Sequence, residues 1–311
     1  MLGRLHAIAA ALLGSTALAA GAAADCDTVR FSDVGWTDIT STTAVATTVL
    51  EALGYRTDVK VLSVPVTYAS LAKGDIDVFL GNWMPTMEAD IRPYLDAGTV
   101  ESVAVNLEGA KYTLAVPRYT YDAGLTDFSE IATFREALDG RIYGIEPGND
   151  GNRLILDMIA SDTFGLGGFD LVESSEQGML AQVARSVAAE EPIVFLGWEP
   201  HPMNANFDMA YLSGGDDIFG PDYGGATVYT NTRAGYAAEC PNVGTLLGQL
   251  RFSLEMENEI MGAILNDGAD PEDAARAWLT VHPEVLDAWL AGVTTIDGGD
   301  GLAAARAGLG I

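Results

Sequence analysis

The sequence contains very few of the residues that build redox and metal sites. Among its 311 residues there are two cysteines and three histidines. Cys26 and Cys240 lie far apart in the chain, so they form neither a CxxC redox pair nor a zinc-binding cluster. In an oxidising compartment we expect a single disulfide between them, and two free buried thiols are the alternative.

Basic residues are scarce as well. Lys and Arg number 16 against 44 Asp and Glu, which gives a formal net charge of −28 at pH 7. A surface of this sign repels nucleic acid and anionic lipid, so we expect no nucleic-acid partner. The excess of acid either favours cationic ligands or only keeps the protein soluble, and the composition leaves both explanations open.

The common motifs of exported enzymes are absent from the sequence. It contains no GxSxG, HExxH, P-loop or EF-hand pattern. His201 and His282 each stand beside a proline, and for His201 we expect a backbone-bonded turn histidine, with a catalytic base as the alternative. The acidic, glycine-rich segment 214–225 is expected to be a solvated loop, and a calcium loop is the alternative. We therefore expect a protein without enzymatic activity, cofactor or metal.

Long hydrophobic runs are missing beyond the N-terminus. No later run reaches the roughly 18 apolar residues that a membrane-spanning helix needs. Residues 1–24 have an early Arg4, then an apolar stretch, and end in three alanines. This is the pattern of a secretory signal peptide cut before Asp25. We expect a mature protein in the periplasm, without membrane insertion.

A regular alternation of short apolar runs and helical patterns is present instead. Strand and helix in alternation predict an α/β protein with a mostly parallel sheet. The expected strands are 28–31, 57–64, 78–80, 112–117, 141–145 and 193–196, and the expected helices are 40–53, 68–73, 128–138, 152–159 and 177–189, followed by a helical tail from 243 to 290.

One stretch is echoed later in the chain. DVFLGNWMP (77–85) and IVFLGWEPHP (193–202) both read as a strand followed by Gly, Trp and Pro. The echo favours two similar lobes, each with a tryptophan just beyond the carboxyl end of a strand, although two α/β units can resemble each other by chance. Open α/β sheets bind their ligands at that edge, so two lobes would form a cleft between them.

Three tryptophans occupy such positions. Trp36 follows the first strand, and Trp83 and Trp198 follow the echoed strands. Each alone could pack under a loop, and Asp38 could simply cap the next helix. Taken together they suggest a quaternary ammonium ligand, because such a cation is held by aromatic faces and its buried charge needs an opposite charge nearby.

Six motifs over nearly the whole mature chain carry a resemblance to a known family. They are GWTDIT (35–40), GDIDVFLGNWMPT (74–86), KYTLAVP (111–117), IEPGNDGN (145–152), FLGWEPHPMN (195–204) and AWLTVHPEVLDAWL (277–290). Together they resemble the periplasmic substrate-binding proteins of ABC importers for choline, within the wider glycine betaine and proline betaine binding family.

The resemblance implies a two-lobe periplasmic binding protein fold. Each lobe would hold a central, mostly parallel sheet, and two crossovers near Pro117 and Asp208 would form the hinge. The first lobe would then comprise residues 25–116 and 209–311, and the second lobe residues 117–208. The protein would act as a monomer that delivers choline to the membrane subunits of an ABC importer.

The resemblance also implies a binding site. The trimethylammonium would lie in a box of Trp36, Trp83, Tyr112 and Trp198, with Asp38 near the ammonium and the alcohol end and Asn149 at the choline hydroxyl. Only the resemblance selects this tyrosine, since the residues alone left four tyrosines open: Tyr112, Tyr119, Tyr121 and Tyr143.

One position departs from the related pattern. Many betaine-binding relatives carry an aromatic residue where this chain has Pro202. Glycine betaine is the alternative main ligand, but its carboxylate would be repelled by Asp38. Acetylcholine is a possible weaker ligand. An exported enzyme acting on a choline ester and a sensor partner of a membrane receptor are the alternatives from other functional classes.

Overall fold

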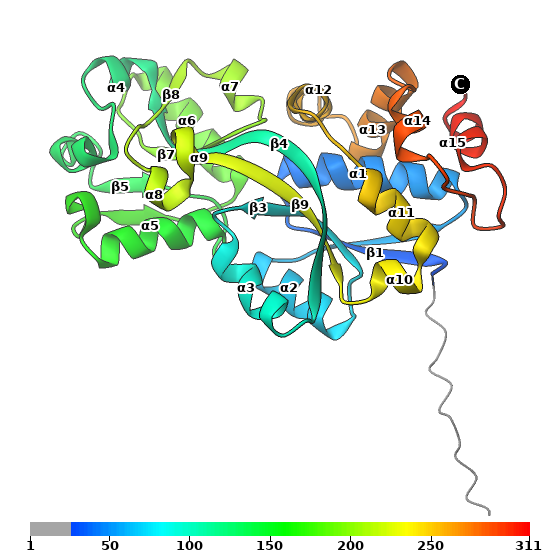
Figure 1. The fold of residues 1–311 in the computed structure, drawn as a ribbon. Helices are drawn as coiled ribbons and strands as arrows, with labels where there is room; N and C mark the ends of the chain where they lie inside the picture. Colours follow the sequence, from blue (N-terminus) through cyan, green and yellow to red (C-terminus); the bar gives the residue numbers. More distant parts are fainter. Residues whose placement is uncertain (1–25) are drawn as a thin grey trace, which may run out of the picture.

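The computed structural model describes residues 26–311, so the expected signal peptide at 1–24 and its cut before Asp25 lie outside the described residues. The strands form one mixed sheet in the order β2-β1-β3-β9-β4-β7-β5-β6, and β8 also pairs with β4 (Figure 1). The strands are β1 (Thr28–Asp33), β2 (Arg56–Val61), β3 (Val78–Met84), β4 (Val100–Pro117), β5 (Arg141–Tyr143), β6 (Asp170–Val172), β7 (Phe195–Glu199), β8 (Met209–Tyr211) and β9 (Gly225–Arg233).

The sheet is parallel at its two ends and antiparallel in the middle. Strands β1, β2 and β3 pair in parallel, and so do β5, β6 and β7. In the middle, β9 runs antiparallel to β3 and β4, and β4 runs antiparallel to β7 and β8. The expected two-lobe α/β fold is confirmed, but the expected mostly parallel sheet in each lobe is corrected to one mixed sheet. Alternating strands and helices predict the parallel parts, whereas the long strands that join the lobes carry no such signal.

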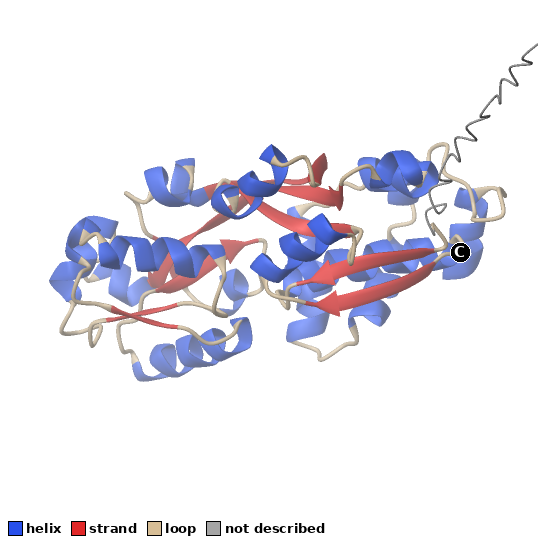
Figure 2. Cartoon of the chain, turned by 90° about the horizontal axis from the view of Figure 1, so that it is seen from below, coloured by secondary structure: helices blue, strands red, loops and turns tan. Residues whose placement is uncertain are grey.

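The helices cover both faces of this sheet (Figure 2). They are α1 (Thr37–Ala52), α2 (Val64–Lys73), α3 (Glu88–Asp96), α4 (Arg118–Asp122), α5 (Asp150–Ala160), α6 (Glu176–Ala189), α7 (Met203–Asn206), α8 (Asp216–Phe219), α9 (Pro221–Gly224), α10 (Tyr236–Glu239), α11 (Pro241–Gln249), α12 (Leu254–Leu265), α13 (Pro271–Val281), α14 (Val285–Trp289) and α15 (Gly301–Leu309), with the 3-10 helices η1 (Phe128–Phe134) and η2 (Thr163–Gly165).

Helix α1 is buried on most of its surface. It is rich in Thr, Ala and Val, and it lies against the sheet on one side and against α12, α13 and α15 on the other. The helical tail therefore packs back onto the part of the chain that contains β1, β2 and β3, which we call the first lobe. Strands β5, β6, β7 and β8 belong to the second lobe. Burying α1 in this way fixes its N-terminus, which borders the cavity described below.

Strand β4 passes from one lobe to the other without a break. Its first half pairs with β9, and its second half pairs with β7 and β8. The last pair between β4 and β9 joins Lys111 to Gly225. The residue after β8 also contacts the second half of β4, since the Leu212 N–H donates to the Leu114 carbonyl at 3.0 Å. The pairing of β4 with β9 therefore reaches almost to the middle of the pairing of β4 with β7.

The two echoed stretches take equivalent places in the two lobes. Each strand, β3 and β7, has a parallel neighbour on one side and an antiparallel crossover strand on the other. The prediction that the strands stop before their tryptophans was wrong: Trp83 and Trp198 lie inside β3 and β7. Strand β3 continues past Gly81. Its pairing with β9 shifts register between Phe79 and Asn82 and then resumes.

The two cysteines form the expected disulfide. Cys26 is bonded to Cys240, across a sequence separation of 214 residues. The bond ties the start of the described chain to the beginning of α11.

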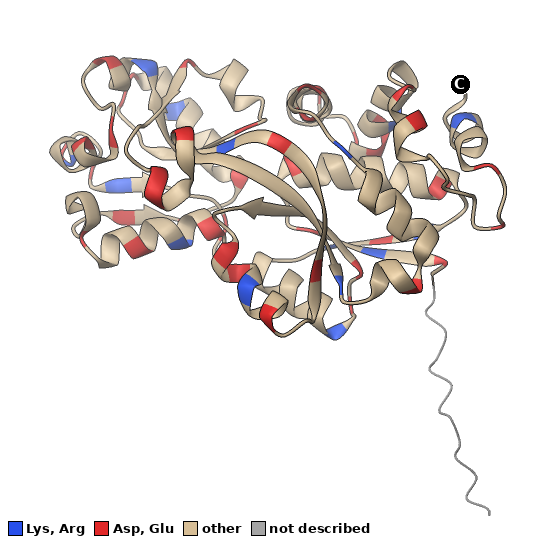
Figure 3. Ribbon diagram, viewed as in Figure 1, with Lys and Arg blue, Asp and Glu red and all other residues tan. Residues whose placement is uncertain are grey.

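Figure 3 shows acidic residues on helices of both lobes. Within residues 26–311 no helix is both long enough and apolar enough to cross a bilayer.

Candidate functional site

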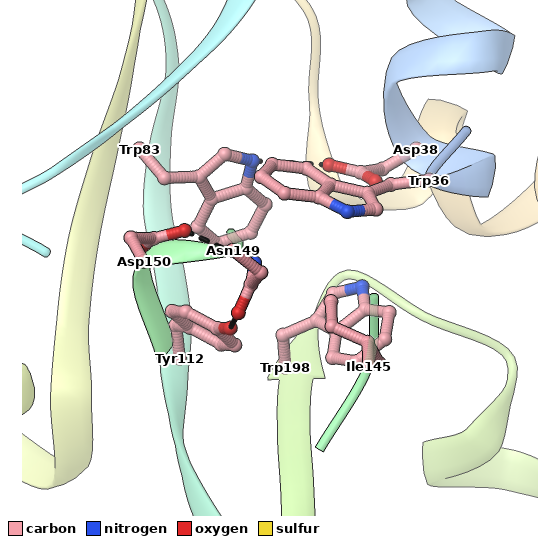
Figure 4. A pocket seen from close by; sticks show the side chains of 8 residues that line it. All are labelled: Trp36, Asp38, Trp83, Tyr112, Ile145, Asn149, Asp150 and Trp198. Carbon is pink, nitrogen blue, oxygen red and sulfur yellow. Dashed lines mark hydrogen bonds between the residues drawn. The ribbon is translucent and has the colours of Figure 1, made fainter. Parts of the chain in front are cut away.

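A small cavity lies between the two lobes. All six ligand-binding residues predicted from the sequence border it, together with Ile145 and Asp150, which were not predicted (Figure 4). The lining residues are Trp36, Asp38, Trp83, Tyr112, Ile145, Asn149, Asp150 and Trp198.

Four aromatic rings surround this cavity. The ring centroids of Trp83 and Tyr112 are 6.1 Å apart at an interplanar angle of 61°, and those of Tyr112 and Trp198 are 6.2 Å apart at 82°. Trp36 lies across the space from Trp198 (Figure 4). Each of the four rings is at most 5% exposed. Rings tilted against one another in this way can turn faces and edges toward one small ligand, which is how proteins hold a quaternary ammonium.

Tyr112 owes its position to neighbouring glycines. Its hydroxyl donates a hydrogen bond to Asn149 Oδ1 at 3.0 Å. A Cβ at Gly151 would come within 2.1 Å of that hydroxyl oxygen, so only glycine allows the contact. Gly224 is held at a φ of +74°, and a Cβ there would come within 2.1 Å of the Tyr112 carbonyl oxygen. Of the four tyrosines that the sequence left open, Tyr112 is the one that lines the cavity.

Asp38 is the acid of the first lobe at this cavity. The carboxylate is 1% exposed, and its Oδ2 accepts a hydrogen bond from Trp83 Nε1 at 3.0 Å. Its Oδ1 has no hydrogen-bond partner among the described residues. Burial raises the pKa of Asp38 to about 8, and the charge of Glu176 acts in the same direction. The interpretation of Asp38 as a plain helix cap was wrong, because α1 begins at Thr37 after Trp36 and has no side-chain cap.

Asn149 has a structural task and spare hydrogen-bonding capacity. Its side-chain oxygen caps α5 by accepting the Asn152 N–H at 2.9 Å, and it also accepts from Tyr112. Its amide nitrogen donates to Asp150 Oδ1 at 3.1 Å. A primary amide carries two N–H donors, so one donor is left for a ligand oxygen in the cavity.

Three sets of hydrogen bonds hold the lobes together beside the cavity. Trp36 Nε1 donates to Glu146 Oε1 at 2.7 Å. The Thr37 N–H donates to Glu176 Oε2 at 2.8 Å. Arg153 of α5 donates to the Thr86 carbonyl and to Asp90 Oδ2, both at 2.9 Å. The chain is therefore in a closed arrangement, with a box tryptophan itself forming one of the contacts between lobes.

His201 and the segment 214–225, which the sequence offered for catalysis and for calcium binding, have structural roles. The Met203 N–H donates to His201 Nδ1 at 2.9 Å, so the ring proton lies on Nε2, which is 3.2 Å from Glu176 Oε1. His201 is thus bonded to backbone and buried, as a turn histidine. The segment 214–225 forms the short helices α8 and α9, with Phe219 packed against Tyr112. Within residues 26–311 no group of three or more His, Cys, Asp or Glu is arranged to hold a metal ion.

Several site residues escaped the sequence reasoning. Ile145, Glu146 and Asp150 all belong to the quoted motif IEPGNDGN, which was used only to place Asn149. Glu176 lies in a segment without any recognised motif, at the start of α6. An acidic residue in the first turn of a helix is common for electrostatic reasons alone, so neither Asp150 nor Glu176 stood out in the sequence.

Comparison with known proteins agrees with this architecture. Residues 27–281 match the model of the substrate-binding domain of ABC-type glycine betaine transport systems. A solved ABC-transporter choline-binding protein in complex with choline is 70% identical, with a TM-score of 0.91, covering 91% of this chain and 98% of that one. An ABC-transporter choline-binding protein in an unliganded semi-closed conformation is 69% identical, with a TM-score of 0.85, covering 93% of this chain and 100% of that one.

A more distant structure shares the fold. Lactococcal OpuAC, in a closed, liganded conformation with glycine betaine, is 24% identical with a TM-score of 0.76, covering 84% of this chain and 98% of that one. The fold and the enclosed interlobe cavity define an extracytoplasmic solute-binding protein of an ABC-type transport system, not an enzyme. The chain belongs to the family of substrate-binding domains of ABC-type glycine betaine transport systems.

Proposed function

We propose that this protein captures choline between its two lobes and delivers it to the membrane subunits of an ABC importer. The observation that carries the proposal is the enclosed cavity in which four aromatic rings surround a space bordered by the buried carboxylate of Asp38. Ring faces attract a quaternary ammonium, each by about 0.5–2 kcal/mol, and a buried carboxylate offsets the desolvation of its charge. The relative solved with choline bound supports the same ligand.

The polar end of the cavity favours an alcohol over a carboxylate. Asn149 has a free N–H donor, and Asp38 Oδ1 is free to accept a hydroxyl proton. The lining residues of the cavity include no Lys or Arg that could pair with a betaine carboxylate. The guanidinium of Arg153 is already bonded to Asp90 and to the Thr86 carbonyl. Glycine betaine would therefore bring a negative group toward Asp38 without a compensating cation, and we rank it below choline.

The proposed working cycle has no chemical step. Choline binds to an open form and shifts the population toward the closed arrangement, in which both lobes contact it. The lobe boundaries near residues 117 and 208 are part of this proposal. We further propose that residues 1–24 are a signal peptide removed on export, that the mature protein works in the periplasm, and that it acts as a monomer.

The direct test is isothermal titration of the mature protein with choline and then with glycine betaine. We expect tight choline binding and weaker betaine binding. The reverse order would mean that the box holds the trimethylammonium group but that the polar end has been assigned to the wrong ligand. Failure of both ligands to bind would overturn the proposal. Acetylcholine, titrated third, reports whether the hydroxyl end has room for a larger group.

Asp38→Asn is expected to weaken choline binding by about tenfold while glycine betaine loses less affinity or gains. The substitution keeps the size of the side chain and removes the charge that faces the cation, and one lost charge contact of this kind is worth about 1–2 kcal/mol. Asp27→Asn, a change of the same kind at an exposed acid that does not line the cavity, is the matched control. An equal loss for both ligands would mean that Asp38 only positions the indole of Trp83.

Choline affinity is expected to rise by about tenfold or more from pH 6 to pH 8. Burial and the charge of Glu176 hold the pKa of Asp38 at about 8, so the empty site is protonated below that pH. A cation prefers the ionised carboxylate, so binding releases a proton and becomes tighter as the pH rises toward the pKa of the empty site. Glu257, also buried next to Asp38, has its pKa raised by burial in the same way. Titration in buffers of different ionisation enthalpy measures the proton release, and an affinity independent of pH in this range would contradict the prediction.

A further inference from the structure

Glu176 is a buried acid of the second lobe that is bonded to the first lobe without lining the cavity. It is the first residue of α6, and its side chain is 0% exposed. Its Oε2 accepts the Thr37 N–H at 2.8 Å, and its Oε1 accepts the Thr37 hydroxyl at 2.5 Å. Thr37 is the first residue of α1. One carboxylate of the second lobe therefore receives both donors of the residue that begins a helix of the first lobe.

Helix α1 has no capping side chain from its own lobe. Its N-cap residue is Trp36, which forms no side-chain hydrogen bond to the first turn. The first N–H groups of a helix lack partners within the helix and carry its positive dipole, so a carboxylate beside them is stabilising. In the closed arrangement Glu176 takes this place from the other lobe. Separating the lobes breaks both bonds to Thr37, so α1 has this cap only in the closed form.

His201 holds the same carboxylate from within the second lobe. Its Nδ1 accepts the Met203 N–H at 2.9 Å, so its Nε2 carries the proton and faces Glu176 Oε1 at 3.2 Å. The centroid of the His201 ring lies 4.8 Å from that of Trp198, at an interplanar angle of 66°. Glu176 therefore joins the residue after Trp36 to the ring that packs on Trp198. We call the bonds of Glu176 to Thr37 and His201 the clasp.

Among side chains of this size, only a carboxylate satisfies all the donors of the clasp. The Thr37 hydroxyl can reverse its hydrogen bond and accept instead. The Thr37 N–H at Oε2 and the His201 N–H at Oε1 can only donate. A glutamine at position 176 would turn its NH₂ group toward one of these two donors in either orientation of the amide. Replacing Glu176 by Gln therefore breaks the clasp while it keeps the size of the side chain.

We propose that Glu176 is a positioning residue for ligand capture, which caps α1 across the lobes on closure and so slows the release of the bound ligand. The inference rests on the proposed function and deepens it, because affinity then depends on a contact that lies outside the cavity. The clasp stabilises the closed form alone, so it raises affinity through the population of that form. Ligand enters the open form before the clasp is made, so the association rate does not depend on it.

The test is stopped-flow fluorescence of the full mature protein with choline. Glu176→Gln should raise the dissociation rate by about tenfold, because bonds to a charged group are lost, and should leave the association rate constant within about twofold. Thr37→Val removes only the hydroxyl, without a change of charge, and should raise the dissociation rate by about threefold. Glu190→Gln, the same change at the exposed end of α6, is the matched control and should alter neither rate. Circular dichroism and thermal unfolding check that each variant is folded.

A double variant tests whether Thr37 and Glu176 act through each other. When Glu176→Ala is already present, Thr37→Val should change the dissociation rate by less than about twofold, since the acceptor of its hydroxyl is gone. An equal effect of Thr37→Val in both backgrounds would overturn the clasp. So would a loss of affinity in Glu176→Gln that comes from slower association. A loss with Glu176→Gln and none with Thr37→Val would also overturn it, and would leave Glu176 as a distant charge that attracts the cation.

The proposed function and the clasp fail in different ways. A wild-type protein that bound no choline would end the proposed function, so that titration comes before any variant is compared. The clasp is then judged without ligand, by small-angle X-ray scattering of the wild type and of Glu176→Ala. The variant should have the larger radius of gyration, because its closed form has lost the cap on α1. Equal radii in that experiment would overturn the clasp.

Discussion

Trp83→Ala is expected to weaken choline binding by about 2–4 kcal/mol, which is roughly 30-fold to 1,000-fold. The indole supplies one wall of the box, and its Nε1 donates to Asp38 Oδ2 at 3.0 Å. Removing it takes away one aromatic face, opens the cavity, and frees the carboxylate that faces the ligand. Isothermal titration of the purified variant measures the loss.

Two further variants separate these contributions. Trp83→Phe keeps an aromatic face but has no N–H for Asp38, so we expect an intermediate loss. Trp278→Ala removes a tryptophan of α13 that stacks on His282 and does not line the cavity, so it should leave choline affinity unchanged. A Trp83→Ala protein that is folded and binds choline within about threefold of the wild type would show that the ligand does not lie in the box.

Replacing both cysteines by serine is expected to lower the free energy of unfolding by about 3–5 kcal/mol without a comparable loss of choline affinity. The disulfide closes a loop with a sequence separation of 214 residues, and the chain-entropy model assigns roughly 5 kcal/mol to a loop of this length as an upper estimate. Neither Cys26 nor Cys240 borders the cavity. Urea unfolding of the wild type and of C26S/C240S, with choline titrated into each, measures both quantities.

The wild-type protein treated with a reducing agent is the matched control for the serine variant. It should unfold at the same urea concentration as C26S/C240S if the covalent bond, and not the change of side chain, is responsible. An unfolding free energy within about 1 kcal/mol of the oxidised protein would mean that the unfolded chain gains little freedom when the bond is cut. The start of β1 would then be held mainly by its pairing with β2 and β3.

The residues that could be predicted are those whose chemistry shows in short local patterns. Trp36, Trp83 and Trp198 stood out because large aromatic side chains followed short apolar runs, and the structure places all three at one cavity. Their exact relation to the strands could not be predicted, because a glycine and a register shift let β3 continue past the point where its apolar run stops. Tyr112 required the resemblance, since a tyrosine in a strand is as often a core residue.

The parts that escaped prediction depend on contacts between distant segments. Strand β9 was assigned to no element, because its polar Thr and Asn residues are buried only through pairing with β3 and β4. Glu146 and Glu176 became site residues only when closure brought Trp36 and Thr37 against them. Both contacts join residues more than 100 positions apart in the sequence, and no local pattern encodes such a contact.

The passage of β4 through both lobes has a mechanical consequence. Two neighbouring strands, β4 and β9, run side by side at the boundary and are hydrogen-bonded up to Lys111 and Gly225 (Figure 1). A ribbon of this kind twists and bends elastically, whereas a loose linker samples many orientations. The lobes can therefore move along one main path, and little orientational entropy is lost when they meet. More of the energy of ligand contact then remains available as affinity.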